Sequence, residues 1–270
     1  MNLEQRVIYD GDDISKEVND FRAGSAAFVY DNAKYLYIGS ILPFNNLWLA
    51  SAVPNTNAAV VTVEMWWGNE WISAVDVLDE TAGLTASGRL QWSTDINKGW
   101  ELEQRSDDIT GLNYPNIYNM YWLRLSWDVD FSALTTLEYV GQKFSSDAIL
   151  YSFYPDLQIA ALKNQYSVGK TSWDEQHYMA AEHIVRDLKK KNMIVSRSQI
   201  LDHSLFTDAS CHKVAEIIYT AFGPPYFDER EAASKQYGAA INIKKMNLDV
   251  NANGRLEPME RVWSTGWGTK

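Results

Sequence analysis

AVVTVEMWWGNEWISAV, residues 59–75, is the stretch that decides the fold of the first half of the chain. It holds two runs of β-branched and aromatic residues, 59–66 and 71–75, separated by the tetrapeptide WGNE. Gly68 and Asn69 accept the positive φ angles that a tight hairpin turn needs. The stretch therefore predicts two antiparallel strands joined in a β-hairpin.

Shorter runs of the same kind lie on both sides of this hairpin. Residues 27–30 and 35–38 are aromatic and β-branched and flank a polar turn, and another short strand is expected around 90–92. Residues 121–127, YWLRLSW, alternate with a period of two, and 137–144 close the region. About eight short strands with polar turns predict an antiparallel, jelly-roll-like β-sandwich.

The second half of the chain has the pattern of helices. Ser172 and Glu175 have the spacing of a capping box, and the apolar residues of 172–188 then recur at helical intervals. A second apolar stripe over 211–222 ends at a Gly-Pro-Pro sequence, and a third helix is expected over 228–241. Three amphipathic helices with short connections predict a small bundle.

The two halves also differ in charge. The chain has 270 residues, with 24 Lys and Arg against 35 Asp and Glu, so its formal net charge is −11. Residues 1–150 contain 9 basic and 21 acidic residues, whereas residues 151–270 contain 15 and 14. We therefore predict an α+β protein with a β-sandwich domain over 1–150 and a helical domain over 151–270, and the acidity belongs to the sandwich.

Composition excludes several classes of protein. A single Cys cannot form an intramolecular disulfide framework or a Cys-based zinc cage. No apolar run approaches the roughly 18–20 residues needed to cross a bilayer, and no signal-peptide pattern is visible, so no membrane association is expected. The net negative charge disfavours a protein that grips nucleic acid through its phosphates.

The sharpest local motif is DVNANGRLEPME, residues 249–260. Its oxygen donors match positions 1, 3, 5, 7 and 12 of the EF-hand calcium loop, where position 7 contributes a backbone carbonyl: Asp249, Asn251, Asn253, Arg255 and Glu260. The motif predicts one structural Ca²⁺. The alternative is a polar turn, because Asn replaces Asp at positions 3 and 5 and fewer charges weaken calcium binding.

Other residues with catalytic potential give weaker signals. His177 lies on the apolar face of a predicted helix and is expected in the core, and Cys211 lies on the buried stripe of the next helix. The pairs Asp107-Asp108 and Asp128/Asp130 have the residue types of glycosidase carboxylates, but acidic pairs are common in loops. We therefore expect no enzymatic activity.

The first half contains eight of the 11 Trp residues. Such residues can stack on sugar rings, form a core or anchor a protein interface, and we favour core and interface. Trp122 and Trp127 lie five residues apart on one predicted strand, so they should point to opposite faces of the sheet. At least one of them should then be buried.

Several segments of the chain follow one another in a familiar order. They are the helix that begins with WDE at 173–175, the loop SRSQIL at 196–201, the stripe HKVAEIIY at 212–219 and the Ala-rich segment AASKQY at 232–237. This order resembles the head–tail connector proteins (adaptor or head-completion proteins) of tailed bacteriophages. The aromatic strands of the first half are similar to β-sandwich modules of phage virion and tail proteins.

The resemblance implies a structural role in the virion, which is assembled in the host cytoplasm. It implies a homo-oligomeric ring, commonly a dodecamer, that lies in the neck between the portal protein and the tail. The ring would contact tail, stopper or terminator proteins and extend the channel through which DNA leaves without specific binding. The C-terminal segment with Trp263 and Trp267 would be a docking arm.

The Trp-rich sandwich keeps an alternative open. A carbohydrate-binding module, or a structural module of the tail or baseplate, would also use an antiparallel sandwich with many aromatic side chains.

Overall fold

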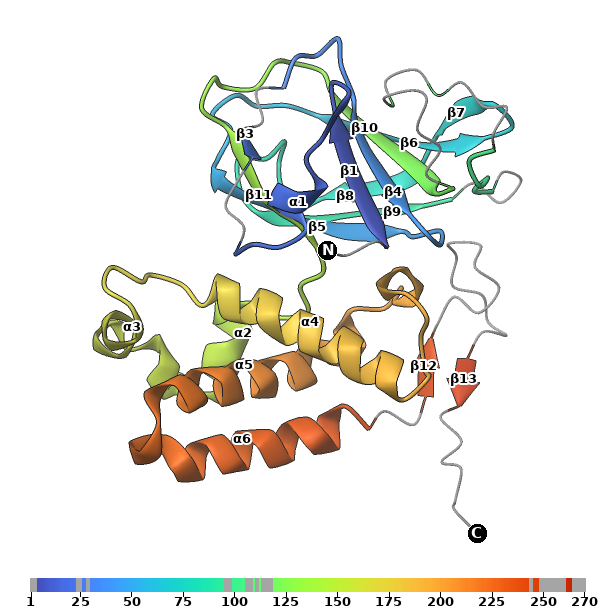
Figure 1. The fold of residues 1–270 in the computed structure, drawn as a ribbon. Helices are drawn as coiled ribbons and strands as arrows, with labels where there is room; N and C mark the ends of the chain where they lie inside the picture. Colours follow the sequence, from blue (N-terminus) through green and yellow to red (C-terminus); the bar gives the residue numbers. More distant parts are fainter. Residues whose placement is uncertain are drawn as a thin grey trace. The chain divides into compact units, whose positions relative to one another are not determined.

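The structure, a computed structural model, describes residues 4–22, 26–27, 30–94, 99–104, 109, 112, 119–242, 245–247 and 261–263, the last two stretches by their backbone alone. These residues form two compact units, one that ends at Gly141 and one that begins at Gln142. The first unit consists mainly of antiparallel strands in two sheets, and the second consists mainly of helices (Figure 1). The protein is therefore α+β, with a sandwich-like β region followed by a helical region, as the sequence predicts.

Within the described residues, the larger sheet has the strand order β2-β1-β4-β10-β6-β7 and is antiparallel throughout. Its strands are β1 Gln5–Tyr9, β2 Asp12–Asp13, β4 Leu36–Ser40, β6 Val61–Trp67, β7 Glu70–Ser73 and β10 Tyr121–Trp127. Strands β6 and β7 form the predicted hairpin, in which Gly68 and Asn69 have φ angles of 62° and 59°. The turn residues thus adopt the conformation that their chemistry favours.

The second sheet has the order β3-β11-β5-β9-β8. Its strands are β3 Ala26–Ala27, β5 Asn46–Val53, β8 Val75–Asp79, β9 Gly88–Ser93 and β11 Thr136–Gly141, and the short helix α1, Ser15–Val18, precedes β3. Among the described strands, the chain passes from one sheet to the other at every step from β2 to β6, and again between β7 and β8, between β9 and β10 and between β10 and β11. Strands distant in sequence therefore become neighbours in each sheet.

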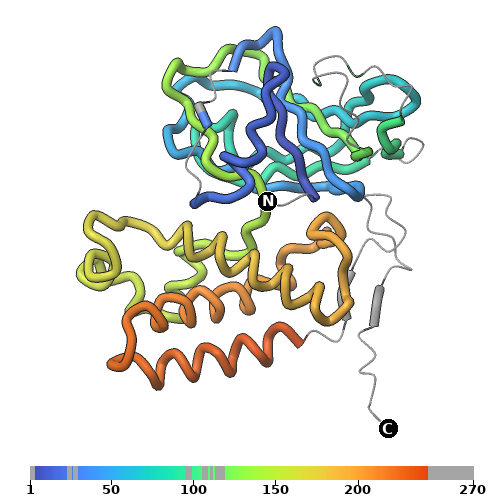
Figure 2. Tube along the Cα trace, viewed as in Figure 1, coloured from blue at the N-terminus to red at the C-terminus, as the bar shows by residue number. Residues whose placement is uncertain are grey.

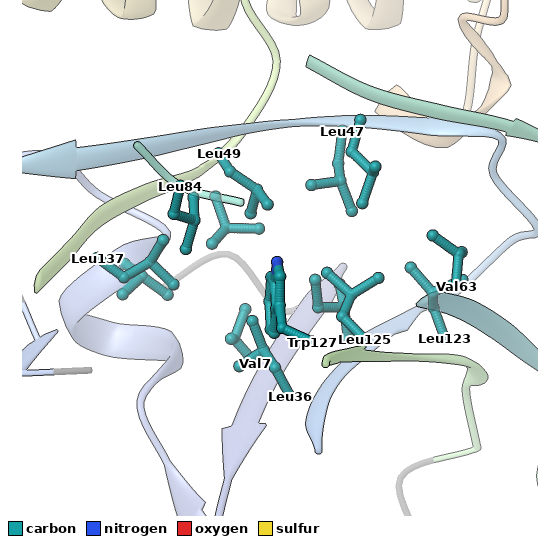
Figure 3. Close-up of a cluster of buried hydrophobic side chains, with 14 of the residues drawn as sticks. Val7, Leu36, Leu47, Leu49, Val63, Leu84, Leu123, Leu125, Trp127 and Leu137 are labelled. Carbon is teal, nitrogen blue, oxygen red and sulfur yellow. The ribbon is translucent and has the colours of Figure 1, made fainter. Parts of the chain in front are cut away.

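A hydrophobic core lies between the two sheets (Figure 3). Leu123, Leu125 and Trp127 alternate along β10 and all point into this core, because side chains on one face of a strand recur every second residue. Trp127 is fixed there by Tyr30, whose ring meets it edge-on with centroids 4.9 Å apart. The backbone N–H of Trp127 also donates to the Tyr30 hydroxyl at 2.8 Å.

Trp122 points to the opposite face of the same strand. It is fully buried in a second apolar cluster on the outer side of the larger sheet, and its indole N–H donates to Glu103 at 3.0 Å. Its ring lies against Gly39, the residue opposite it on β4. Trp122 and Trp127 therefore occupy opposite faces of the sheet, and both are buried, which satisfies the prediction from their spacing.

The second unit is a set of packed helices followed by a strand pair. Its elements are α2 Asp147–Phe153, η1 Pro155–Gln158, α3 Ala160–Tyr166, α4 Asp174–Lys190, η2 Arg197–Gln199, η3 Ser204–Phe206, α5 Thr207–Phe222, η4 Pro224–Tyr226, α6 Phe227–Ala240, β12 Lys245–Asn247 and β13 Arg261–Trp263. Helix α5 packs against both α4 and α6 and runs antiparallel to them (Figure 2). None of the described helices is long and apolar enough to cross a bilayer.

Two helices begin differently from the prediction. Helix α4 has Trp173 rather than Ser172 as its N-cap residue, and no side chain caps it from that position. Instead, both carboxylate oxygens of Asp147 accept from the backbone N–H of Trp173 at 3.2 Å. Helix α6 begins at Phe227, one residue before the predicted start at Asp228, and it too lacks a side-chain cap.

A capping box does occur elsewhere in the unit, where Ser196 and Gln199 cap the short helix η2 reciprocally. Helix α5 ends where the sequence predicts, because Gly223 follows it with a φ angle of 78°.

Candidate functional site

A chain of buried polar side chains runs through the helical unit. Ser145 precedes α2, and its hydroxyl lies 2.7 Å from Nδ1 of His177 on α4 and 2.7 Å from the hydroxyl of Ser210 on α5. Nε2 of His177 lies 3.1 Å from Oδ1 of Asp147, the first residue of α2. Three separate elements, α2, α4 and α5, are thus joined through the hydroxyl of Ser145 and the imidazole of His177, and both residues are buried.

The carboxylate fixes the tautomer of this imidazole. Asp147 only accepts hydrogen bonds when ionised, so Nε2 of His177 carries the proton and Nδ1 accepts from Ser145. Burial lowers the pKa of His177 below its ordinary value despite the hydrogen bond to Asp147, so the ring is neutral. Burial also opposes ionisation of Asp147, but hydrogen bonds from His177 and Tyr151 hold its pKa below the ordinary value.

The residue types of this network are those of a hydrolase triad, but its arrangement is that of a structural contact. A catalytic Ser must reach a substrate carbonyl, whereas Ser145, His177 and Ser210 are all buried. Both ring nitrogen atoms of His177 already have hydrogen-bond partners within the unit. The network therefore joins α2, α4 and α5 and satisfies polar groups that would otherwise be buried unpaired.

Two further histidines hold the segment that enters the helical unit. Nε2 of His203 lies 2.5 Å from the side-chain oxygen of Gln142, and Nδ1 of His212 lies 2.9 Å from the hydroxyl of Tyr154. With His177, three His side chains therefore fix residues 142–154 to the helices. Among the described residues, no group of His, Cys, Asp and Glu is arranged to hold a metal ion.

Cys211 lies beside this network and is fully buried, as its place on the apolar stripe predicts. Burial raises the pKa of its thiol to about 12, so the thiolate that acts as a nucleophile is not populated near neutral pH. Cys211 therefore packs as a small apolar residue.

The Trp residues of the sandwich are mostly core. Trp66, Trp92, Trp122 and Trp127 are buried, and the remaining described Trp side chains of the sandwich are partly buried: Trp48, Trp67, Trp71 and Trp100. In the part of the chain that the structure describes, no Trp is fully exposed as a flat platform. The expectation that Trp residues form core agrees with this burial.

One aromatic group on the outer face of the larger sheet is partly accessible. The guanidinium of Arg124 lies between the rings of Tyr35 and Trp71, 4.0 and 4.7 Å from their centroids, and its Nε donates to Glu64 at 2.6 Å. Arg124 and Glu64 are directly opposite each other on β10 and β6. The group is a cross-strand ion pair covered by aromatic rings.

The acidic residues singled out in the sequence do not form a pair of catalytic carboxylates in the described region. Asp128 accepts from the backbone N–H of Val60 at 2.7 Å, and Asp130 accepts from the backbone N–H of Asn32 at 2.8 Å. Both carboxylates therefore fix loops. Asp107 and Asp108 lie outside the described residues.

The predicted calcium loop also lies outside the described residues, with all five predicted ligands: Asp249, Asn251, Asn253, Arg255 and Glu260. The structure describes the backbone on either side of it, where β12 and β13 pair antiparallel with Asn247 opposite Arg261. Flanking strands, rather than the two helices of an EF-hand, thus adjoin the motif. Trp263 contributes backbone to β13, and Trp267 lies outside the described residues.

A second network, in the sandwich, was not anticipated from the sequence. Asn55 is buried between three loops: its Nδ2 donates to the carbonyls of Asn57 and Gly83, and its Oδ1 accepts from the backbone N–H of Asn57 and Ser132. Gly83 and Ser132 are distant from Asn55 in sequence, and only the strand order brings them together. No local pattern around Asn55 or Ser145 signals these contacts.

No protein-family model matches the chain, and no curated protein matches it significantly.

Proposed function

We propose that the protein is a structural virion protein of a tailed phage, and that it forms a ring between the portal and the tail. The observation that carries the proposal is the helical unit, in which α4, α5 and α6 follow one another as in the connector proteins that the sequence resembles. The described groups with catalytic potential are buried or bound within the fold. A role in assembly accounts for both observations without a catalytic step.

The proposal also assigns a role to each part of the chain. The sandwich is jelly-roll-like, because its chain repeatedly crosses between two antiparallel sheets. The helical unit is the connector-like part, and the motif at 249–260 supplies one structural Ca²⁺ through side-chain and backbone oxygens. The segment with Trp263 and Trp267 is the docking arm toward the portal or the tail, stopper or terminator proteins.

The charge of the chain suits a ring through which DNA passes. The formal net charge is −12 over residues 1–150 and +1 over residues 151–270. An acidic sandwich repels phosphates and keeps a large assembly soluble, and a helical part that is nearly neutral in net charge does not grip the DNA that passes it. In this proposal the sandwich is an appendage of the ring.

Imaging of the assembled particle that contains the chain tests the proposal directly. We expect density for the two units in the neck, repeated around the channel axis, with the portal on one side. Placement of the chain in the capsid shell, the tail tip or outside the particle would contradict it.

A carbohydrate-binding module is the second candidate, and the aromatic group around Arg124 is the observation that favours it. Trp71 and Tyr35 are partly exposed, and the Arg124–Glu64 pair beside them could meet sugar hydroxyl groups. A glycan array is the test of this alternative. Binding that Trp71→Ala abolishes would support it, and an array without any bound glycan would remove it.

A further inference from the structure

One end of the helical unit combines acidic residues with exposed apolar side chains. The first turn of α6 holds Asp228 and Glu229, both exposed, directly after Phe227, which is 51% exposed. Ile159, between η1 and α3, is 55% exposed. We call Ile159 and residues 227–229 the acidic end.

Tyr219 on α5 shows that the two parts of the acidic end lie together. Its hydroxyl donates to Asp156 of η1 at 2.8 Å, three residues before Ile159. Its ring stacks on Tyr226, the residue before Phe227, with centroids 5.7 Å apart. Tyr219 thus brings η1 and the start of α6 together, so Ile159 and Phe227 are exposed at the same end of the unit.

Another surface of the same unit has the opposite charge. At the end of α4, the side chains of Arg186 and Lys190 are 54% and 68% exposed, and Lys191 follows them. Val195, in the connection after α4, is 72% exposed. We call Arg186, Lys190, Lys191 and Val195 the basic end.

The two ends lie at opposite extremes of the helical unit. The hydroxyl of Tyr237, near the end of α6, donates to Asp187 at 2.6 Å, and Nζ of Lys191 donates to the side chain of Asn242 at 2.8 Å. The last turns of α4 and α6 are therefore neighbours. Because α6 has 14 residues and rises about 1.5 Å per residue, its first turn lies about 20 Å from the basic end.

From this arrangement we infer that copies of the chain associate head to tail, with the acidic end of one copy against the basic end of the next. The acidic end also holds Arg230, whose guanidinium lies 4.7 Å from the ring centroid of Phe227, and at the basic end Asp187 lies 4.0 Å from both Arg186 and Lys190. The two ends remain opposite in net charge, and each adds an apolar side chain that loses water on contact. A contact between two different surfaces of identical copies propagates, and it closes into a ring when the rotation allows. The inference rests on the proposed ring and names the surfaces that join its copies.

Helix dipoles explain only part of this pattern. Acidic residues in a first turn and basic residues in a last turn are favoured in any isolated helix. The dipole does not favour the exposure of Phe227, Ile159 and Val195 beside those charges. A contact surface accounts for the charge and the apolar exposure together.

Charge reversal at one end at a time gives a decisive test in the full-length protein. The acidic-end variant carries Asp228→Lys and Glu229→Lys, and the basic-end variant carries Arg186→Glu and Lys190→Glu. By sedimentation velocity at several hundred micromolar and 50 mM salt, we expect the wild type to self-associate and each variant alone to stay monomeric. An equimolar mixture of the two variants should associate again, because each then meets an oppositely charged end.

Two controls separate the contact from general charge effects. The first control carries Asp12→Lys and Glu70→Lys in the sandwich. It changes the net charge of the chain by the same amount as the acidic-end variant, but away from both ends, so it should associate like the wild type. Raising the salt to 500 mM should weaken wild-type association at least about tenfold, because exposed charges are screened. Circular dichroism confirms that each variant is folded.

The inference is overturned if the wild type stays monomeric, if either variant associates like the wild type, or if the mixture remains monomeric. Its failure is distinct from failure of the proposed function. A neck ring whose copies touch through other surfaces would refute the inference alone. Head-to-tail association of a chain that imaging places elsewhere would refute the proposed location alone.

Discussion

The hydroxyl of Ser145 lies 2.7 Å from Nδ1 of His177, which joins the segment entering the helical unit to the middle of α4. Asp147 holds the other nitrogen of the same ring, at 3.1 Å. One imidazole thus sets the position of the first helix of the unit relative to the bundle.

Replacing His177 should destabilise the helical unit. The change His177→Phe leaves Ser145 and Asp147 without their buried partner, and we expect a loss of about 2–4 kcal/mol in the free energy of unfolding. Urea titration of the full chain, followed by circular dichroism at 222 nm, measures it. His183→Phe is the matched control, because His183 lies on the same helix but is partly exposed, and it should cost less than about 0.5 kcal/mol. Equal losses of unfolding free energy in the two variants would show that the hydrogen-bond network of His177 does not stabilise the unit.

The stability of the helical unit should also depend on pH in a defined direction. Burial lowers the pKa of His177 in the folded chain, so below the unfolded value of about 6.5 the unfolded state binds more protons. The contribution of His177 is therefore complete above about pH 7.5 and declines as the pH falls through 6.5. Urea midpoints at pH 7.5, 6.5 and 5.5 should show a shallower decline in His177→Phe than in the wild type. Parallel pH curves would contradict this role.

Asn55 should be a sensitive position in the sandwich. Asn55→Ala removes hydrogen bonds to three loops and leaves buried backbone groups unpaired, so we expect a loss of about 2–4 kcal/mol. Thr56→Ala, at the exposed neighbouring residue, should change stability by less than about 0.5 kcal/mol. Near-ultraviolet circular dichroism during urea unfolding follows the aromatic core. A tolerated Asn55→Ala would mean that the loops are held by their other contacts.

Gly39 should be intolerant of a side chain. A Cβ at this position would lie 2.8 Å from the ring of Trp122 and 2.9 Å from the sulfur of Met120, closer than packed atoms allow. We expect Gly39→Ala to cost about 1–3 kcal/mol. Adding Trp122→Leu should cost less in the Gly39→Ala background than in the wild type, because the clash is then relieved. Strictly additive losses in this double-mutant cycle would show that the two residues are independent.

Calcium removal tests the motif at 249–260. If the loop binds Ca²⁺ in the folded chain, EDTA should lower the Tm, because a ligand that binds only the folded state stabilises it. Glu260→Ala should abolish this response, since the residue at position 12 supplies both carboxylate oxygens. Glu70→Ala, in the hairpin turn of the sandwich, is the control and should keep the response. A wild-type Tm that is the same with and without EDTA would remove the site.

Local patterns predicted much of the secondary structure. The hairpin of β6 and β7, the alternating strand β10 and the helices α4, α5 and α6 all follow from periodicity and turn residues. Strand β8 and the short helices α2 and α3 were missed. So were strands β1 and β5, whose sequences QRVIY and NLWLASAV mix polar or small residues with apolar ones. Their burial depends on neighbours that local sequence does not reveal.

The contacts that fix the site were beyond local prediction for the same reason. The capping box predicted at Ser172 is absent, because α4 has Trp173 as its N-cap residue, and Asp147, distant in the sequence, accepts from the backbone N–H of Trp173. His177 was correctly expected in the core, but its partners come from the segment that leaves the sandwich. Sequence periodicity identifies a buried face, whereas the hydrogen-bond partners on that face follow from the tertiary fold.

The strand order has a consequence for synthesis on the ribosome. Strand β4 ends at Ser40, yet its partner β10 begins only at Tyr121. At about 5–20 residues per second, a nascent chain carries β4 without that neighbour for several seconds. The helical unit, by contrast, forms from helices that follow one another directly, and such local contacts form quickly. We therefore expect the sandwich to be the slower of the two units to fold, and the growing chain to be most exposed to aggregation in the interval before β10 emerges.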